Sequence, residues 1–415
     1  MAAAVSGAMG ERPDEAFWGT GRNRGWSGRA PVVNVMIAAL ALVVVATVVG
    51  LVWLWPRGSA VEPHSIVVTR TLPARVVAVA SAHCTLTADQ SCQLVKARLL
   101  GGRDKGTTTS FEFLPTPGVS RLRGGDRIRV VRNPPPPRGT PVAARLPAYS
   151  FSDFDRRLPL LWLGITCGML LLATGRWHGL RAIAGLATSL LIVLKFVIPS
   201  ILHGHSAVAV ALTGSLTVLL ITIPLCYGLR AKAIAAWLGT TISLVLAVTL
   251  ASLFTHIAHL SGASSDEAVF LSSTDNRISL QGLLLAGIVI GALGVLVDLT
   301  VSQASTVIAL RRAKPSQTFT ALFRGALDVG HDHIAATVNT LVFAYAGAAL
   351  PVLLIFSIGH TSFTDALNSE SVSEEVVAAL IGSIGLIASM PITTALAALL
   401  APHLADKQVD HAHAH

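Results

Sequence analysis

The sequence predicts a mainly α-helical bundle that crosses a membrane about eight times and carries a small extracytoplasmic β-barrel-like domain after its first span. Hydrophobic residues make up 52% of the 415 residues and charged residues only 13%, against roughly 25% charged residues in a typical soluble domain. Several apolar runs exceed 18 residues, which is long enough to cross about 30 Å of hydrocarbon as a helix. After the first of these runs, β-type segments alternate with turn signals.

The formal net charge of +9 indicates membrane topology rather than nucleic-acid binding. One set of polar connections is rich in Arg and Lys, whereas the alternate loops, residues 200–206, 256–278 and 358–375, contain only Arg277. By the positive-inside rule, both termini are predicted to be cytoplasmic and the β domain to lie outside a bacterial cell membrane. The expected partners are the lipid bilayer and an unknown small-molecule or ion substrate, with no nucleic acid. The sequence is also compatible with a homo-oligomer.

The first apolar run, residues 32–55, is predicted to be a retained membrane anchor. Its apolar core is too long for a signal peptide, and the Trp-Pro-Arg sequence that ends it is a poor cleavage site. Seven further spans are predicted at approximately 158–175, 180–199, 207–228, 233–255, 279–309, 334–357 and 376–401. The predicted divisions are a cytoplasmic tail (1–31), the anchor (32–55), the β domain (57–150), a seven-helix membrane domain (156–402) and a His-rich cytoplasmic tail (403–415).

Short β-type segments predict a small OB-like barrel between the anchor and the second span. They lie at residues 65–70, 74–80, 92–100, 107–113 and 126–132. The proline run at 133–137 predicts a stiff spacer that leads back to the membrane. Cys84 and Cys92 are eight residues apart in this domain. We expect them to form a disulfide, provided that the strands bring them close enough.

The 279–309 span carries small and polar residues on one face of its helix. Asp298 lies 13 residues before Arg311, about 20 Å along the axis and so near the middle of the bilayer. An ionised carboxylate that faces lipid there costs at least about 2.5–3.5 kcal/mol, so we expect Asp298 to face the bundle interior, to be paired or to be protonated. The residues of this face fall within roughly 80° of one another; they are Gly287, Gly291, Gly294, Asp298, Ser302 and Ser305.

The 334–357 span and its lead-in carry a second polar stripe. Asp328, Asp332 and Asn339 fall within about 40° on a helical projection. Depth along the two spans is expected to place Tyr345 near Asp298, and Asn339 near Ser302 and Ser305. We therefore expect the two spans to pack around one polar cleft. The candidate intramembrane site is Asp298, Ser302, Ser305, Asn339, Thr340 and Tyr345, and the packing glycines are Gly287, Gly291, Gly294 and Gly347.

Simpler roles stay open for several of these residues. Asp328, His331 and Asp332 are expected at the cytoplasmic mouth of the helix, where an acidic residue also stabilises a helix N-terminus. The hydroxyl groups of Ser302, Ser305 and Thr340 equally suit hydrogen bonds between helices.

Metal and cofactor sites are not predicted. His331 and His333 are two residues apart and point in different directions on a helix. The histidines at 411, 413 and 415 suit either a metal or a flexible polar end. Because no HExxH, CxxC, Walker A or GxGxxG sequence is present, we expect no metal, no cofactor and no enzymatic activity. An intramembrane aspartyl protease needs two acids at one depth, whereas Asp298 is expected at the midplane and Asp332 at the boundary.

The segments GALGVLVDLTVSQAST (291–306) and DVGHDHIAATVNTLVFAYAGAALP (328–351) resemble the YibE/F family of bacterial membrane proteins. His331 stands where the family pattern has Arg or Lys, and Ala335 where it has Gly, so a cationic role at 331 is in doubt. The resemblance covers about residues 60–400 and implies a multi-pass inner-membrane protein, described as a transporter without a settled substrate. High Ala, Gly and Arg usage suggests a GC-rich, actinobacterial source. The matching positions are Gly291, Gly294, Asp298, Ser302, Ser305, Gly330, Asp332, Asn339, Thr340, Ala344, Tyr345 and Gly347.

Two functions follow from these observations. The first is a secondary transporter or permease, coupled to protons through Asp298, because this acid lies in the membrane interior and no nucleotide-binding sequence is present. The alternative is a non-transporting membrane scaffold or assembly factor that binds partners through its extracytoplasmic β domain.

Overall fold

The structure is a computed structural model of the chain. It describes residues 31–57, 71–84, 91–115, 121–134, 147–228, 231–274 and 278–403. The predicted strand at 65–70 and residues 404–415 of the predicted His-rich tail lie outside the described residues. The chain forms two compact units. The first, here called the helical unit, is Met1–Pro56, Ile192–Asp266 and Ser279–His415; the second, here called the β unit, is Arg57–Leu191 and Glu267–Ile278.

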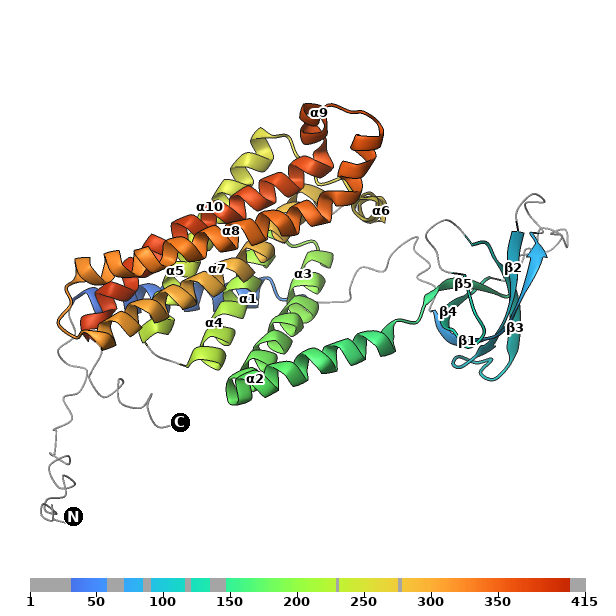
Figure 1. The fold of residues 1–415 in the computed structure, drawn as a ribbon, viewed down its shortest axis with the longest axis horizontal. Coiled ribbons are helices and arrows are strands. Elements are labelled where there is room, and N and C mark those ends of the chain that lie inside the picture. The colour runs from blue at the N-terminus through green and yellow to red at the C-terminus, as the bar shows by residue number, and fades with distance from the viewer. Residues whose placement is uncertain are drawn as a thin grey trace, which may run out of the picture. The chain divides into compact units, whose positions relative to one another are not determined.

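Seven of the described helices are long and apolar enough to cross a membrane (Figure 1), which confirms the predicted mainly α-helical, multi-pass fold. They are α1 (Pro31–Trp53), α2 (Arg157–Ile192), α4 (Ala207–Tyr227), α5 (Ala231–Ile257), α7 (Leu280–Ala313), α8 (Phe319–Ile358) and α10 (Glu370–Leu400). α2 continues through a π-helical turn, η2 (Val193–Val197), into α3 (Ile198–Leu202). The short helices are α6 (Asp266–Thr274), α9 (Phe363–Asn368) and η3 (Ala401–His403).

α2 is two helices folded back on each other, which accounts for the eighth predicted span. At Arg176 the backbone leaves the helical region, with φ 45° and ψ −119°. Beyond this break Gly179 lies against Leu171, so closely that a Cβ added to Gly179 would stand 2.1 Å from the Leu171 carbonyl oxygen. The turn therefore falls between the predicted spans 158–175 and 180–199, and it requires glycine at 179.

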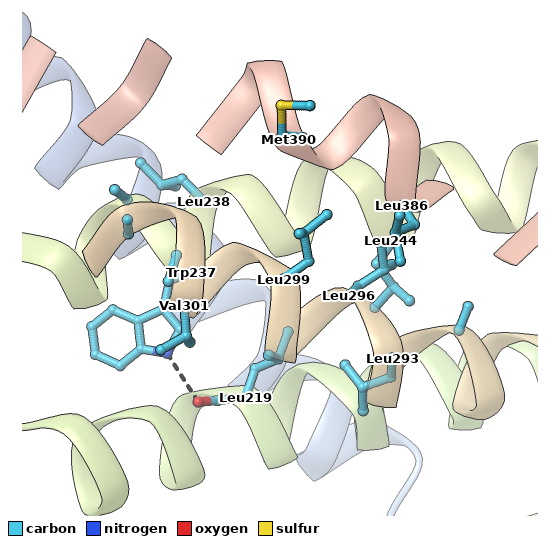
Figure 2. Packing of buried hydrophobic residues seen from close by; sticks show 14 of the residues in the cluster. Leu219, Trp237, Leu238, Leu244, Leu293, Leu296, Leu299, Val301, Leu386 and Met390 are labelled. Atoms are coloured by element: carbon cyan, nitrogen blue, oxygen red, sulfur yellow. Dashed lines mark hydrogen bonds between the residues drawn. The ribbon is translucent and has the colours of Figure 1, made fainter. Parts of the chain in front are cut away.

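The core of the helical unit lies where α5, α7 and α10 pack together. Leu244 of α5, Leu296 of α7 and Leu386 of α10 are completely buried, and Figure 2 shows them close together. At the side of this cluster the Trp237 indole N–H donates to the Leu219 carbonyl oxygen of α4 at 2.9 Å. By contrast, α1 and α8 leave most of their apolar side chains exposed, as expected for helices that face lipid.

A five-stranded antiparallel sheet forms the β domain, in the spatial order β3-β2-β1-β4-β5. The edge strands β3 and β5 contact each other, so the sheet curls into a half-barrel that encloses its own apolar core. A bulge between Val76 and Ala78 adds local bending to β1. The predicted small β-barrel-like domain is thus confirmed. Its strands are β1 (Leu72–His83), β2 (Ser91–Leu99), β3 (Thr108–Phe113), β4 (Arg127–Arg132) and β5 (Tyr149–Phe154).

The last strand was not predicted, and most of the proline run that was expected to lead back to the membrane lies outside the described residues. After β4 the chain returns to the sheet as β5 instead of leading directly to the membrane. Asn133 holds this return, because its side-chain amide donates to the Pro147 carbonyl oxygen at 2.6 Å and to the Ser150 hydroxyl at 2.5 Å. Phe151 then packs edge-on against Phe113 of β3, with ring centroids 4.9 Å apart.

The predicted disulfide is present. Cys84 and Cys92 are bonded, with their Cα atoms 5.1 Å apart. The bond lies at the end where β1 and β2 pair, because Ala82 and Cys92 are partners in that ladder. It therefore closes the β1–β2 hairpin.

Candidate functional site

Helix α7 carries polar residues on two faces, and only one face is buried. Ser279 caps its first turn by accepting the Gly282 N–H at 3.0 Å, and Arg311 lies in its last turn. Between these ends, Thr300 and Gln303 are at most 2% exposed. Asp298, on the other face, is exposed.

The exposed face of α7 forms a polar strip, which we define as Gly287, Gly291, Gly294, Asp298 and Ser302. A Cβ added to Gly287 or Gly294 would meet nothing within 4 Å. The expected close approach of a neighbouring helix is therefore not seen at these two glycines. Within the part of the chain that the structure describes, the Asp298 carboxyl makes no ion pair. Asp298 was expected to face the bundle interior, to be paired or to be protonated; the structure leaves its side chain exposed.

Helix α8 meets α7 in a register that differs from the predicted one. The Tyr345 hydroxyl lies 3.1 Å from the position that a Gly291 Cβ would occupy. Tyr345 is half-buried there, about 10 Å along α7 from Asp298. Closer to the C-terminal end of α7, the Gln303 amide lies 3.0 Å from the position that a Cβ added to Gly330 would occupy. Interpolation between these two contacts places residue 336, rather than Tyr345, at the depth of Asp298, with Asn339 about 5 Å away along α8.

The predicted site residues on α8 are mostly not brought into a shared cleft with α7. Asn339 and Thr340 are exposed, and the Thr340 hydroxyl donates within its own helix to the Ala336 carbonyl oxygen at 2.9 Å. Gly347 is exposed, and a Cβ there would meet nothing within 4 Å. On α7, Ser305 is half-buried. The approach of the Tyr345 hydroxyl to Gly291 therefore joins the predicted polar face of α7 to the predicted site residues of α8.

The predicted mouth residues lie inside a helix rather than at its start. α8 begins at Phe319, with Thr318 as its cap, so Asp328 is nine residues into the helix. The helix dipole acts within about the first turn, which removes the proposed N-terminal role of Asp328 and Asp332. Both acids and His331 are exposed. The polar segment before the apolar run belongs to α8, so this helix begins earlier in the chain than predicted.

A buried polar cluster, which the sequence analysis missed, joins α5, α7, α8 and α10. The Gln303 amide nitrogen donates to the Ala326 carbonyl oxygen at 2.7 Å and to the Thr394 hydroxyl at 2.9 Å. The hydroxyls of Thr240 and Thr300 lie 2.6 Å apart. We define this polar cluster as Thr240, Thr300, Gln303, Thr393 and Thr394, all at most 2% exposed.

Two glycines make room for the polar cluster. A Cβ on Gly239 would stand 2.1 Å from the Thr393 hydroxyl oxygen, and one on Gly330 would stand 2.9 Å from the Met390 sulfur. The Thr393 hydroxyl makes no hydrogen bond among the described residues. A signal for the cluster was available: Thr300 and Gln303 are one helical turn apart, inside an otherwise apolar span.

Comparison with known proteins supports a family assignment. A family profile described as YibE/F-like protein matches residues 163–403. No match was found among curated proteins or among solved structures. The matched range contains α7 and α8, with both the polar strip and the polar cluster.

Replacing Gly330 by Ala should destabilise the helical unit by about 1–3 kcal/mol, because the new methyl group overpacks the site between Gln303 and Met390. Gly347→Ala on the same helix is the matched control, since its Cβ enters open space. Thermal unfolding of the purified protein measures both. Equal melting temperatures for the two variants would contradict this account of the cluster.

Proposed function

Because the chain belongs to the YibE/F-like family and is a multi-pass membrane protein, we propose that it is a secondary transporter or permease. The proposal places it in a bacterial cell membrane, with a small molecule or ion as substrate and with proton coupling through Asp298. It does not involve an enzymatic step.

The position of Asp298 along α7 is the observation that supports this proposal. Its carboxyl lies 18 residues from the start of α7 and 15 from its end, about 27 Å and 22 Å along the axis. It is exposed on the polar strip, not sequestered in the polar cluster. An acid at this depth is expensive to maintain in lipid, and acids of this kind mark ion and proton pathways in transporters.

The neighbours of Asp298 suit a path for small polar species. Ser302, one turn further along α7, presents a hydroxyl on the same strip, and Asn339 of α8, about 5 Å along its helix from the depth of Asp298, is also exposed. Gly294 leaves open space on the other side of Asp298. Hydroxyl and amide groups can donate and accept hydrogen bonds, so they can replace part of the hydration shell of a moving solute.

Replacing Asp298 by Asn should abolish proton flux, because the amide keeps the shape of the side chain but cannot carry the proton. Flux is measured with the full chain in proteoliposomes, using an entrapped pH-sensitive dye and an imposed membrane potential. We expect at least a tenfold loss, to the level of protein-free liposomes. Asp266→Asn, an exposed acid at the start of α6, is the control and should retain flux. Wild-type flux in Asp298→Asn would contradict the proposal.

A membrane scaffold or assembly factor is the second candidate, favoured by a β domain that has its own buried core. Deleting residues 60–154 separates the two functions, because this deletion removes every strand through Phe154. A permease should retain proton flux in the same liposome assay. Flux from the intact chain no higher than that of protein-free liposomes would make the scaffold the better account.

A further inference from the structure

Three arginines form a row across the middle of the β-sheet. In the sheet register Arg75 of β1 is paired with Arg98 of β2 on one side and with Arg127 of β4 on the other. Directly paired residues lie on the same face of a sheet, and neighbouring strands are about 4.8 Å apart. All three side chains are exposed. We call this set the arginine row.

The arginine row carries an electrostatic cost that the described part of the β domain does not offset. Like charges directly opposite one another destabilise a sheet. The ion pairs found among the described residues join Arg132 to Asp104, Arg156 to Asp153 and Arg157 to Asp155, none of them in the row. Arg98 does donate from Nε to the Gly106 carbonyl oxygen at 3.3 Å, but this neutral acceptor leaves the charge uncompensated. The row therefore suits an anionic partner.

Arg127, at one end of the arginine row, also lines a shallow, open pocket of about 240 Å³. The other lining residues are Asp155, Arg157, Leu158 and Leu161. Arg157 lies 4.0 Å from the Asp155 carboxylate, and Arg127 makes no ion pair among the described residues, so the pocket lining holds two positive groups and one negative group. The pocket thus combines an excess positive charge with leucines from the first turns of α2.

We propose that the arginine row and this pocket bind the phosphate-bearing headgroup of an anionic phospholipid. Guanidinium groups bind phosphate oxygens through paired hydrogen bonds. The apolar side of the pocket fits the start of an acyl chain, which a soluble anion lacks. Basic residues close to a membrane surface attract anionic lipids in the same way.

The chain itself holds this face near the membrane. β5 ends at Phe154 and α2 begins at Arg157, so two residues separate the sheet from a helix that is apolar enough to cross the bilayer. The pocket draws residues from both sides of this connection. The inference is independent of transport, because it concerns only residues of the β unit.

The test uses the detergent-solubilised full-length protein and native mass spectrometry during titration with phosphatidylglycerol or phosphatidylcholine. Each arginine near a membrane surface contributes about fivefold to the affinity for anionic lipid. The triple variant Arg75→Ala/Arg98→Ala/Arg127→Ala should therefore bind phosphatidylglycerol roughly 100-fold more weakly, with phosphatidylcholine binding unchanged. Arg127→Gln alone should lose about fivefold, and it serves if the triple variant does not fold.

The matched control removes the same charge elsewhere on the domain, as Arg103→Ala/Lys105→Ala/Arg121→Ala, at exposed positions outside the row. This variant should bind phosphatidylglycerol within about twofold of wild type, since charge at the surface alone is screened. Equal losses in the two triple variants, or wild-type binding by both, would overturn the proposal. Displacement of phosphatidylglycerol by an equal concentration of inorganic phosphate would also overturn it, in favour of a soluble anion.

Discussion

The rest of the helical unit depends on how α7 satisfies its polar groups, because a polar side chain inside a bilayer must find a partner or remain costly. On one face Gln303 meets this requirement: its amide nitrogen joins the Ala326 carbonyl oxygen of α8 to the Thr394 hydroxyl of α10. Gly330 provides the space, because a Cβ there would stand 3.0 Å from the Gln303 amide oxygen. These contacts fix the rotation of α7 between α8 and α10.

That rotation decides where Asp298 points. Asp298 is five residues from Gln303, about 140° away around the helix, so turning Gln303 into the core turns Asp298 outward. The same rotation exposes Ser302 and opens the surface above Gly287 and Gly294. The buried polar cluster thus stabilises the fold and leaves the costly acid on an open strip. An acid that contributed only to packing would be expected in the cluster rather than on the strip.

The sequence predicted the elements of this structure better than their contacts. Apolar length located the spans and helical periodicity located the strip, while two cysteines in a domain expected to lie outside the membrane predicted the disulfide. Periodicity could not show which polar face of α7 is buried, because both faces carry small and polar residues. Nor could it find β5: two serines and an aspartate after a proline run are typical of a linker, and the segment becomes a strand by pairing with β4 and packing on Phe113.

The central claim is that the polar strip around Asp298 is in contact with water inside the membrane. Reactivity of a single cysteine with a water-soluble thiol reagent tests it most directly, because thiols react as thiolates, which form in water. In a background with Cys167 and Cys226 replaced by Ser, Ser302→Cys should react readily. Phe343→Cys, at an apolar position of α8 that is 75% exposed and that the account assigns to lipid, should not. Equal lack of reaction at both positions would contradict the account.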